Sequence, residues 1–236
     1  MFRKAVPGDL DQIAAIYDAI HTEEESGRAA IGWIRAIYPT RQTAADAIQA
    51  GDMYVAEEEG RIVASAKIDQ AQVDVYADAP WSRDDAPDAV LVLHTLVVDP
   101  SYKGRGCATR FVHFYEDLGR KRSCTALRMD TNEKNKNARA LYARLGYREV
   151  GIVPCTFNGI PGVNLVCLEK TLDDGLYIRT AQAEDLDAIA AVEAECFPPA
   201  EAAGKAEFAS RLAHYSSHFW LLFQQDKRIA FVDGMV

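Results

Sequence analysis

The sequence lacks any apolar run close to the roughly 18–20 residues that a membrane-spanning helix needs. Its first residues, MFRKAVPGDLDQIA, contain no apolar core of the roughly 7–15 residues typical of a secretory signal peptide. We therefore expect no membrane partner and a cytoplasmic location.

The sequence also has few positively charged residues, and its cysteines do not follow the spacing of a known motif. The chain has 26 Lys and Arg residues against 35 Asp and Glu residues, a net charge of −9. Because duplex nucleic acid is bound mainly through Lys and Arg, we expect no nucleic-acid partner. The five cysteines show neither a CxxC pair nor the Cys and His spacing of a metal site. They predict reduced thiols, and we expect no metal.

The composition is that of a folded protein, and the length exceeds one domain. Hydrophobic residues make up 49% of the chain and charged residues 26%, which are ordinary values for a globular protein. At about 150 residues per domain, 236 residues correspond to more than one domain and fewer than two.

The chain resembles itself at an offset of 176 residues. Residues 3–17 and 179–193 share eight of fifteen positions, and each stretch predicts a short strand followed by an amphipathic helix. Two hairpin patterns follow, over residues 53–68 and 220–236. We interpret residues 1–172 as a complete domain. Residues 173–236 then form a tandem repeat of its first half, with the order strand, helix, helix, hairpin.

An incomplete copy would have an unpaired sheet edge and an uncovered face. We expect residues 173–236 to mediate association with another chain, as in a homo-oligomer, or to cap the first domain.

The pattern of residues 1–172 predicts a mixed α/β sheet, because expected strands and helices alternate along it. Helix-then-hairpin order argues against a doubly wound nucleotide-binding fold. Helices are expected over residues 8–24, 28–50, 106–121 and 135–145. Strands are expected over residues 2–6, 52–58, 61–69, 89–98, 126–130, 147–153 and 162–170. A polar, Asp-rich insertion covers residues 70–88.

A glycine-rich turn follows the apolar strand that ends near Val98. Gly104 and Gly106 allow close approach of the backbone to a ligand, and a helix is expected to begin near Gly106. Helix N-termini carry free N–H groups and a positive dipole end, so the turn is suited to an anion. Lys103 and Arg105 add positive charge. The alternative is a plain tight turn, and neither a Walker loop nor GxGxxG is present.

Two blocks together resemble the GNAT N-acetyltransferase superfamily. KGRGCA is similar to its [Q/R]xxGx[G/A] signature, with Lys103 in place of Gln or Arg. Residues 135–147 resemble its NxxAxxLYxxxGF pattern, with Tyr147 in place of Phe. The resemblance covers residues 1–170 in element order. It implies a GNAT acyl-CoA N-acyltransferase fold, in which the central sheet splays between its fourth and fifth strands to admit acetyl-CoA.

The resemblance also implies roles for individual residues. The backbone of Leu96, Val97 and Val98 would pair with the pantetheine arm of acetyl-CoA, with Asn135 and Ala138 beside that arm. Tyr142 would protonate the departing thiolate, although alone it could equally be a core aromatic residue. The pyrophosphate would be held by backbone amides of the turn, from Lys103, Gly104, Arg105, Gly106, Cys107, Ala108 and Thr109.

A general base is harder to place. His94 lies in the segment HTLVVDP, which resembles the HxHxLAV of arylalkylamine N-acetyltransferases, with Val92 replacing the first histidine. A single histidine on a buried strand can equally be a structural residue. Asp130 and Glu133 are weaker candidates.

The acceptor pocket of such folds involves the first two helices, the loop between them and the last hairpin. Trp33, Arg35, Tyr38 and Phe157 fall in these segments and are candidates for its lining, with plain packing as the alternative. The acidic residues 23–25 and the Asp-rich insertion would attract a cationic amine, unless they only form a solvated surface.

The sequence thus predicts an acetyl-CoA-dependent N-acetyltransferase that acts by direct attack in a ternary complex. Its acceptor would be a primary amine of a small molecule or peptide. Alternatives are a non-catalytic acyl-CoA-binding regulatory or assembly module, and a purely structural protein. The segment EAECFPPAEAA in the incomplete copy also resembles the early part of arylalkylamine N-acetyltransferases.

Overall fold

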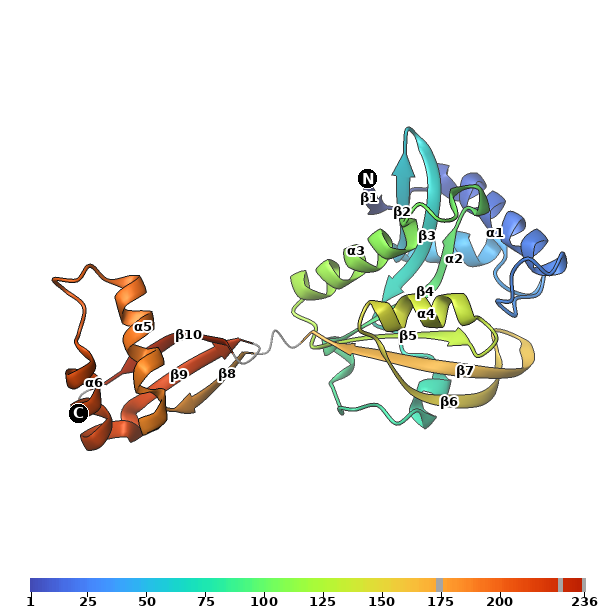
Figure 1. The fold of residues 1–236 in the computed structure, drawn as a ribbon. Helices are drawn as coiled ribbons and strands as arrows, with labels where there is room; N and C mark the ends of the chain where they lie inside the picture. The colour runs from blue at the N-terminus through green and yellow to red at the C-terminus, as the bar shows by residue number, and fades with distance from the viewer. Residues whose placement is uncertain (173–175, 225–226, 235–236) are drawn as a thin grey trace. The chain divides into compact units, whose positions relative to one another are not determined.

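The computed structural model describes residues 1–172, 176–224 and 227–234. The chain divides into two compact units, Met1–Leu172 and Asp173–Val236 (Figure 1). Each unit is described by itself below.

The first unit contains a seven-stranded sheet and four α-helices (Figure 1). Its strands are β1 (Phe2–Lys4), β2 (Met53–Glu58), β3 (Arg61–Asp69), β4 (Val90–Val98), β5 (Ala126–Asn132), β6 (Arg148–Phe157) and β7 (Ile160–Thr171). Its helices are α1 (Leu10–Glu25), α2 (Arg41–Ala50), α3 (Cys107–Lys121) and α4 (Lys136–Arg144). The strand order is β1-β2-β3-β4-β5-β7-β6, in which only β4 and β5 are parallel neighbours. The predicted mixed α/β sheet is therefore confirmed.

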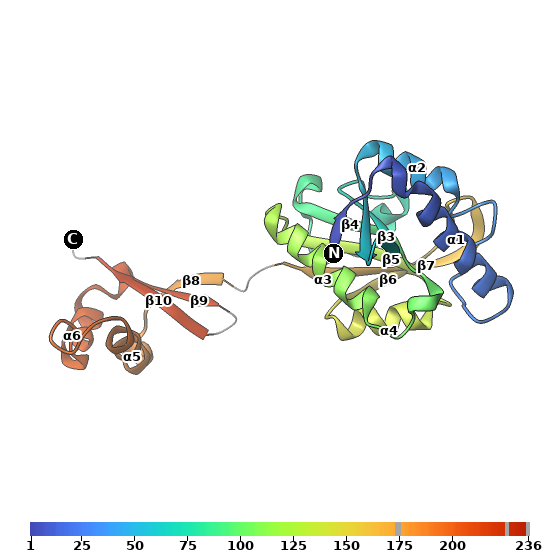
Figure 2. The ribbon, with the colours of Figure 1, turned by 90° about the horizontal axis from the view of Figure 1, so that it is seen from above.

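Helices cover both faces of this sheet, with α1 and α2 on one face and α3 and α4 on the other (Figure 2). The alternation of residues along β4 explains this arrangement, because successive side chains of a strand point to opposite faces. Leu91 and Leu93 pack in the same core as Phe111 of α3. Val90 and Val92 pack on the other face against Tyr76, from the segment between β3 and β4. Both faces are buried, so β4 is apolar along most of its length.

The expected helix over residues 28–50 is wrong in its first half. Only Arg41–Ala50 is helical, and Thr40 caps it by accepting the Thr43 N–H at 3.3 Å. Gly27 and Gly32 have positive φ angles of 73° and 85°, a left-handed backbone that interrupts a right-handed helix. Pro39, just before the cap, also cannot donate a helical hydrogen bond. Residues 26–40 therefore form a loop beside the sheet.

The last hairpin is longer than the expected strands 147–153 and 162–170. Its strands β6 and β7 continue until only a two-residue turn separates them. Asn158 and Gly159 have φ angles of 50° and 79°, the conformation that favours an Asn-Gly pair. The strands expected over residues 52–58 and 61–69 leave Glu59 and Gly60 as the turn between them, and the structure confirms this with φ angles of 52° and 77°.

The second unit contains β8 (Leu176–Thr180), α5 (Leu186–Cys196), α6 (Lys205–Tyr215), β9 (Phe219–Gln224) and β10 (Lys227–Asp233). Its sheet has the order β10-β9-β8. Arg179 binds Asp185 at 2.7 Å, as Arg3 binds Asp9 at 2.7 Å in the first unit. The element order is the one expected from the sequence. Origin by duplication and a role in association stay predictions.

Across the described parts of both units, no helix combines the length and hydropathy required to cross a membrane.

Candidate functional site

The sheet of the first unit opens between β4 and β5. The two strands pair with each other from Val90 opposite Ala126 to Leu93 opposite Met129. Beyond these residues β4 continues to Val98 and β5 to Asn132, and in the described structure they no longer pair with each other. The Tyr115 hydroxyl, from α3, lies 2.6 Å from the Leu91 carbonyl oxygen on β4 and 3.0 Å from that of Arg128 on β5. It ties the paired ends of the strands together from one face.

A bulge in β4 lies just beyond the last pair with β5. Val97 is opposite Ser65 of β3 and His94 is opposite Lys67, so β4 holds one extra residue between these pairs. Thr95 has a φ of 53°, which is rare for a β-branched residue. The bulge and the end of pairing together free the C-terminal half of β4 from β5.

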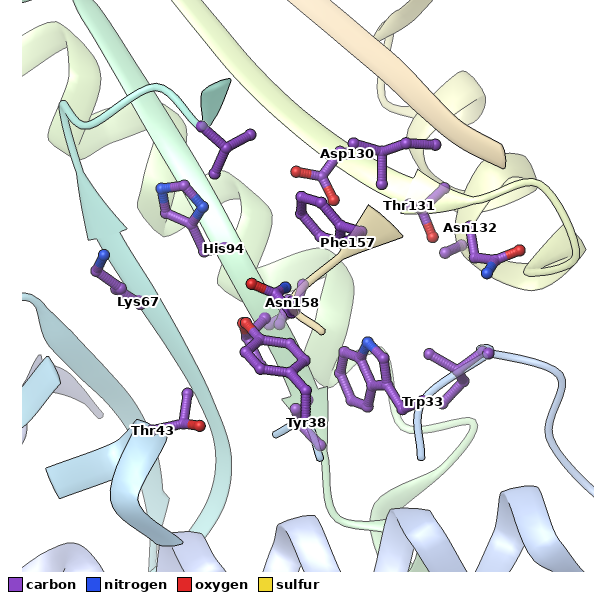
Figure 3. A pocket seen from close by; sticks show the side chains of 18 of the residues that line it. Trp33, Tyr38, Thr43, Lys67, His94, Asp130, Thr131, Asn132, Phe157 and Asn158 are labelled. Carbon is purple, nitrogen blue, oxygen red and sulfur yellow. The ribbon is translucent and has the colours of Figure 1, made fainter. Parts of the chain in front are cut away.

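A cavity of about 570 Å³ occupies this split. Its walls come from α1, the α1–α2 loop, α2, β3, the insertion after β3, β4, β5, α4 and the β6–β7 hairpin (Figure 3). The side chains that matter below are Trp33, Tyr38, Lys67, His94, Asp130, Asn135, Ala138, Tyr142 and Phe157.

His94 is held by a carboxylate on the neighbouring strand. Its Nε2 lies 2.9 Å from Asp69 Oδ1, and Lys67 Nζ lies 2.7 Å from Asp69 Oδ2. Burial raises the pKa of the Asp69 carboxyl, but the hydrogen bonds from His94 and Lys67 outweigh burial and bring it to about 2. Asp69 is therefore ionised at neutral pH. It fixes the proton of the imidazole on Nε2, and Nδ1 remains as the acceptor nitrogen.

Asp130 lies on β5, on the other side of the split from His94 (Figure 3). Tyr76 Oη donates to Asp130 Oδ2 at 2.8 Å. Burial raises the pKa of the Asp130 carboxyl to about 6, although the Tyr76 hydrogen bond and the nearby His94 lower it. Two carboxyl groups near one cavity thus have opposite pKa shifts.

Tyr142 extends from α4 into the wall of the cavity and is 7% exposed. Burial raises the pKa of its hydroxyl well above the ordinary value, and Asp130 adds to the effect. Within the described residues no group forms a hydrogen bond with this hydroxyl. Tyr142 is therefore protonated at neutral pH and free to donate.

The glycine-rich turn lies on the surface at the start of α3, outside the cavity lining. Gly104 and Gly106 have φ angles of 81° and 71°, and a Cβ on Gly104 would meet nothing within 4 Å. Backbone amides without an acceptor in the described structure are those of Gly104, Gly106, Cys107, Ala108 and Thr109. A cradle of free amides at a helix N-terminus fits a phosphate group.

The basic side chains of this turn have other partners. Arg110 donates to Glu58 at 2.6 Å and to the Arg105 carbonyl at 2.8 Å. Arg105 lies over the Tyr102 ring at 4.8 Å. The anion site therefore consists mainly of backbone, with Lys103 exposed beside it.

Comparison with known proteins agrees with this geometry. The sequence model of the acetyltransferase (GNAT) family matches residues 13–147, more than half of the chain. The chain belongs to the GNAT acetyltransferase family. Members of this family use acetyl-CoA as the acetyl donor and act on amines.

Solved GNAT structures share the fold of the first unit. A GNAT acetyltransferase from Streptococcus agalactiae is 27% identical, with a TM-score of 0.61, over 72% of this chain and 94% of that one. Another from Listeria monocytogenes has 24% identity and a TM-score of 0.56, over 73% and 94%. The predicted GNAT fold is confirmed.

A curated relative matches over a shorter stretch. An uncharacterized N-acetyltransferase of Methanocaldococcus jannaschii is 29% identical over 79 residues, which are 34% of this chain and 35% of the relative. The chain therefore spans about a third of the length of this relative.

The cavity brings together most of the residues that the sequence suggests for the GNAT site. Leu96, Val97 and Val98 line it with their freed backbone, and Asn135 and Ala138 lie across from them on α4. The Asn135 side chain also caps α4, because its Oδ1 accepts the Ala138 N–H at 3.2 Å.

The suggested acceptor residues divide into two groups. Trp33, Tyr38 and Phe157 line the cavity, and the Trp33 and Tyr38 rings are 6.1 Å apart, edge to face. Arg35 lies outside it, because its guanidinium binds Glu25 at 2.7 Å and also Asp18. Arg35 holds the loop against α1 rather than lining the pocket.

Sequence reasoning missed Lys67, Tyr76 and the pairing of Asp69 with His94. Asp69 and Lys67 are two residues apart on one strand and so share a face, which was a usable signal. The register between β3 and β4, which brings this face to His94, could not be predicted from the sequence. Glu133, the other weak candidate for a base, binds Asn164 Nδ2 at 2.8 Å and is absent from the cavity lining.

Among the described residues, no group of three or more His, Cys, Asp or Glu side chains is arranged to hold a metal ion.

Proposed function

We propose that this chain transfers the acetyl group of acetyl-CoA to a primary amine bound in the cavity between β4 and β5. One observation carries the proposal. The split of a GNAT sheet holds a histidine fixed by a carboxylate on one side and a protonated, unpartnered tyrosine hydroxyl on the other. These are the two groups that acetyl transfer to an amine needs.

The chain offers a continuous set of contacts for acetyl-CoA. The free amides of Gly104 and of residues 106–109 would hold its phosphates, whereas the Arg105 amide already donates to the Tyr102 carbonyl. The backbone of residues 96–98 would pair with its pantetheine arm, with Asn135 and Ala138 beside it. When bound, acetyl-CoA supplies a thioester carbonyl that an amine can attack. An acceptor amine bound in the same cavity would be held close to that carbonyl.

His94 acts as the base in this proposal. Asp69 keeps the Nε2 proton in place, so Nδ1 can accept a proton from the acceptor amine. The positive charge that develops on the ring lies 2.9 Å from a carboxylate that stays ionised. Asp69 therefore stabilises the protonated imidazole.

Tyr142 acts as the acid. Its raised pKa keeps the hydroxyl protonated at neutral pH, so it can donate a hydrogen bond, and then its proton, to the departing thiolate. Donation to sulfur completes the release of the free thiol.

A non-catalytic acyl-CoA-binding module is the alternative. It would need the same turn and the same split, but neither the Asp69–His94 pair nor the free Tyr142 hydroxyl. Both are present, so the enzyme is favoured.

The test follows thiol release from acetyl-CoA with three amines, 2-phenylethylamine, spermidine and a short peptide with a free N-terminus. We expect turnover with at least one of them, and a roughly 10²-fold lower kcat for Tyr142→Phe. Tyr147→Phe is the matched control, because the Tyr147 hydroxyl is also buried but lies outside the cavity lining. Calorimetric binding of acetyl-CoA without turnover of any amine would favour the non-catalytic module.

A further inference from the structure

The insertion between β3 and β4 contributes a side chain to the site. Tyr76, in the short 3-10 helix Asp74–Asp78, is 2% exposed, and its hydroxyl donates to Asp130 Oδ2 at 2.8 Å. In the described residues, this is the hydrogen bond that the Asp130 carboxyl receives. Oδ1 is the oxygen left for the cavity that Asp130 lines.

A buried polar network holds Tyr76 in place. Trp81 Nε1 donates to the Tyr76 carbonyl at 2.8 Å, and the Arg128 guanidinium lies 4.2 Å from the centre of the Trp81 ring. Arg128 also donates to Gln72 Oε1 at 2.5 Å and to the Arg83 carbonyl at 3.0 Å. The insertion is therefore tied to β5 at several points, which makes the Tyr76 hydroxyl a rigid donor.

Glu169 of β7 completes the network. It is 3% exposed, accepts the Ser82 N–H at 3.1 Å, and lies 3.6 Å from Arg128. Glu169 thereby links β7 to both the insertion and Arg128, although Glu169 Oε1 and Arg128 Nε have no hydrogen-bond partner among the described residues.

Asp130 is the cavity carboxylate that lies near His94 and has one oxygen without a hydrogen bond in the described structure. Asp69 is already engaged by His94 and Lys67. Asp46 and Asp52 also line the cavity, from α2 and just after it, and Asp46 accepts Gln42 Nε2 at 2.7 Å. An ammonium group that entered the cavity beside Asp130 would find its counter-charge at this residue.

We propose that Tyr76 is a positioning residue that orients Asp130 to bind the ammonium group of the acceptor, next to the base His94. The inference rests on the proposed function, since it assigns the acceptor end of the same site. In this arrangement Oδ2 is fixed by Tyr76, Oδ1 receives the ammonium, and Nδ1 of His94 takes its proton.

The first test needs no turnover. In carbon-13 NMR of the full chain, the Asp130 carboxyl signal, assigned by its loss in Asp130→Asn, is titrated with acid. The groups near it are Tyr38, Tyr76, His94, Tyr142, Cys155 and Cys167. We expect a midpoint near 6, and a higher midpoint in Tyr76→Phe because a hydrogen bond to the ionised form is lost. An unchanged midpoint in Tyr76→Phe would overturn the role of Tyr76.

Amine binding gives the second readout. Adding 2-phenylethylamine, spermidine or the peptide without acetyl-CoA should shift the Asp130 signal for at least one of them. Apparent affinity should fall about 3- to 10-fold in Tyr76→Phe. No shift with any of the three would overturn the anchor role. Absence of turnover with the NMR result intact would instead count against the proposed function alone.

Steady-state kinetics distinguish a role of Tyr76 in positioning Asp130 from a general role in the fold. Tyr76→Phe should raise the KM for the amine at pH 7 by the same factor and leave the KM for acetyl-CoA unchanged. In an Asp130→Asn background it should have no further effect, because both changes act through one group. Asp78→Asn, an exposed carboxylate of the same insertion, is the control for charge. Equal losses in both backgrounds would indicate a structural role and contradict the proposal.

Discussion

The two sides of the split shift the pKa of the same kind of side chain in opposite directions. On the β3–β4 side, Asp69 accepts hydrogen bonds from His94 and Lys67, and its pKa is lowered to about 2. On the β5 side, Asp130 has a neutral phenol as its partner and apolar walls, and its pKa is raised to about 6. Two hydrogen-bond donors, one of them the Lys67 ammonium group, outweigh burial at Asp69, whereas the single Tyr76 hydroxyl does not outweigh it at Asp130.

This difference assigns separate tasks to the two groups. A carboxylate that is always ionised suits the orientation of a base, whereas one that is free on one oxygen suits the binding of a cation. The β3–β4 side should therefore control kcat and the β5 side should control the KM for the amine. Each variant below tests that separation.

The largest expected effect is on the base. His94→Ala should lower kcat about 10²- to 10³-fold, because the proton of the amine loses its acceptor. The KM for acetyl-CoA should change little. His113→Ala is the matched control, since His113 is exposed on α3. Steady-state kinetics at pH 7.5 check this, and a His94→Ala enzyme with unchanged kcat would remove His94 from the mechanism.

The second largest effect is expected from removing the charge of Asp130, on the β5 side of the split. Asp130→Asn keeps the shape of the side chain and should raise the KM for the amine about 10- to 100-fold, because a hydrogen bond to a charged group is weakened. The same steady-state assay gives both parameters. A fall in kcat with an unchanged KM would mean that Asp130, rather than His94, is the base.

A smaller effect is expected from Asp69→Asn, which leaves His94 in place but no longer fixes its Nε2 proton. We expect kcat to fall about tenfold, and the pH optimum to change because the imidazolium loses a counter-charge. Asp74→Asn, exposed in the insertion, is the control. A pH–rate profile for Asp69→Asn that matches the wild type would break the link between Asp69 and His94.

The smallest effects concern stability, and their signs are opposite. The lowered pKa of Asp69 stabilises the fold above pH 4, and that stabilisation is lost as the pH falls towards 2. The raised pKa of Asp130 means that the folded chain binds this proton more tightly, so stability rises as the pH falls from 6 to 4.

Denaturant unfolding of the full chain at several pH values checks both signs. Asp130→Asn should be more stable than wild type at pH 7.5, and Asp69→Asn should be less stable. A destabilised Asp130→Asn would contradict the unfavourable environment assigned to its charge.

Much of the site could be predicted from the sequence, because it depends on the spacing of residues close together in the chain. The turn at Gly104 and Gly106, the helix that carries Tyr142, and the strand that carries His94 are each encoded within a few residues. The hairpin turn at Glu59 and Gly60 is local in the same way. Such features can be found without knowing which strands pair.

The remaining features depend on long-range pairing. Asp69 meets His94 only because β4 is bulged at Thr95, which shifts its register against β3. Tyr76 reaches Asp130 through an insertion that reads as a polar loop, yet is fixed by Arg128 and Trp81. A pattern of polar residues does not reveal which buried partner each one will meet.

The most direct test of the account is to follow the acetyl group itself. The full chain is incubated with acetyl-CoA labelled in the acetyl group and with each of the three amines, and the protein, the amine and the free thiol are then separated. Direct transfer between β4 and β5 predicts label in at least one amine, one free thiol for each acetyl transferred, and no label on the protein. Label held by the protein, or thiol released without labelled amine, would contradict it.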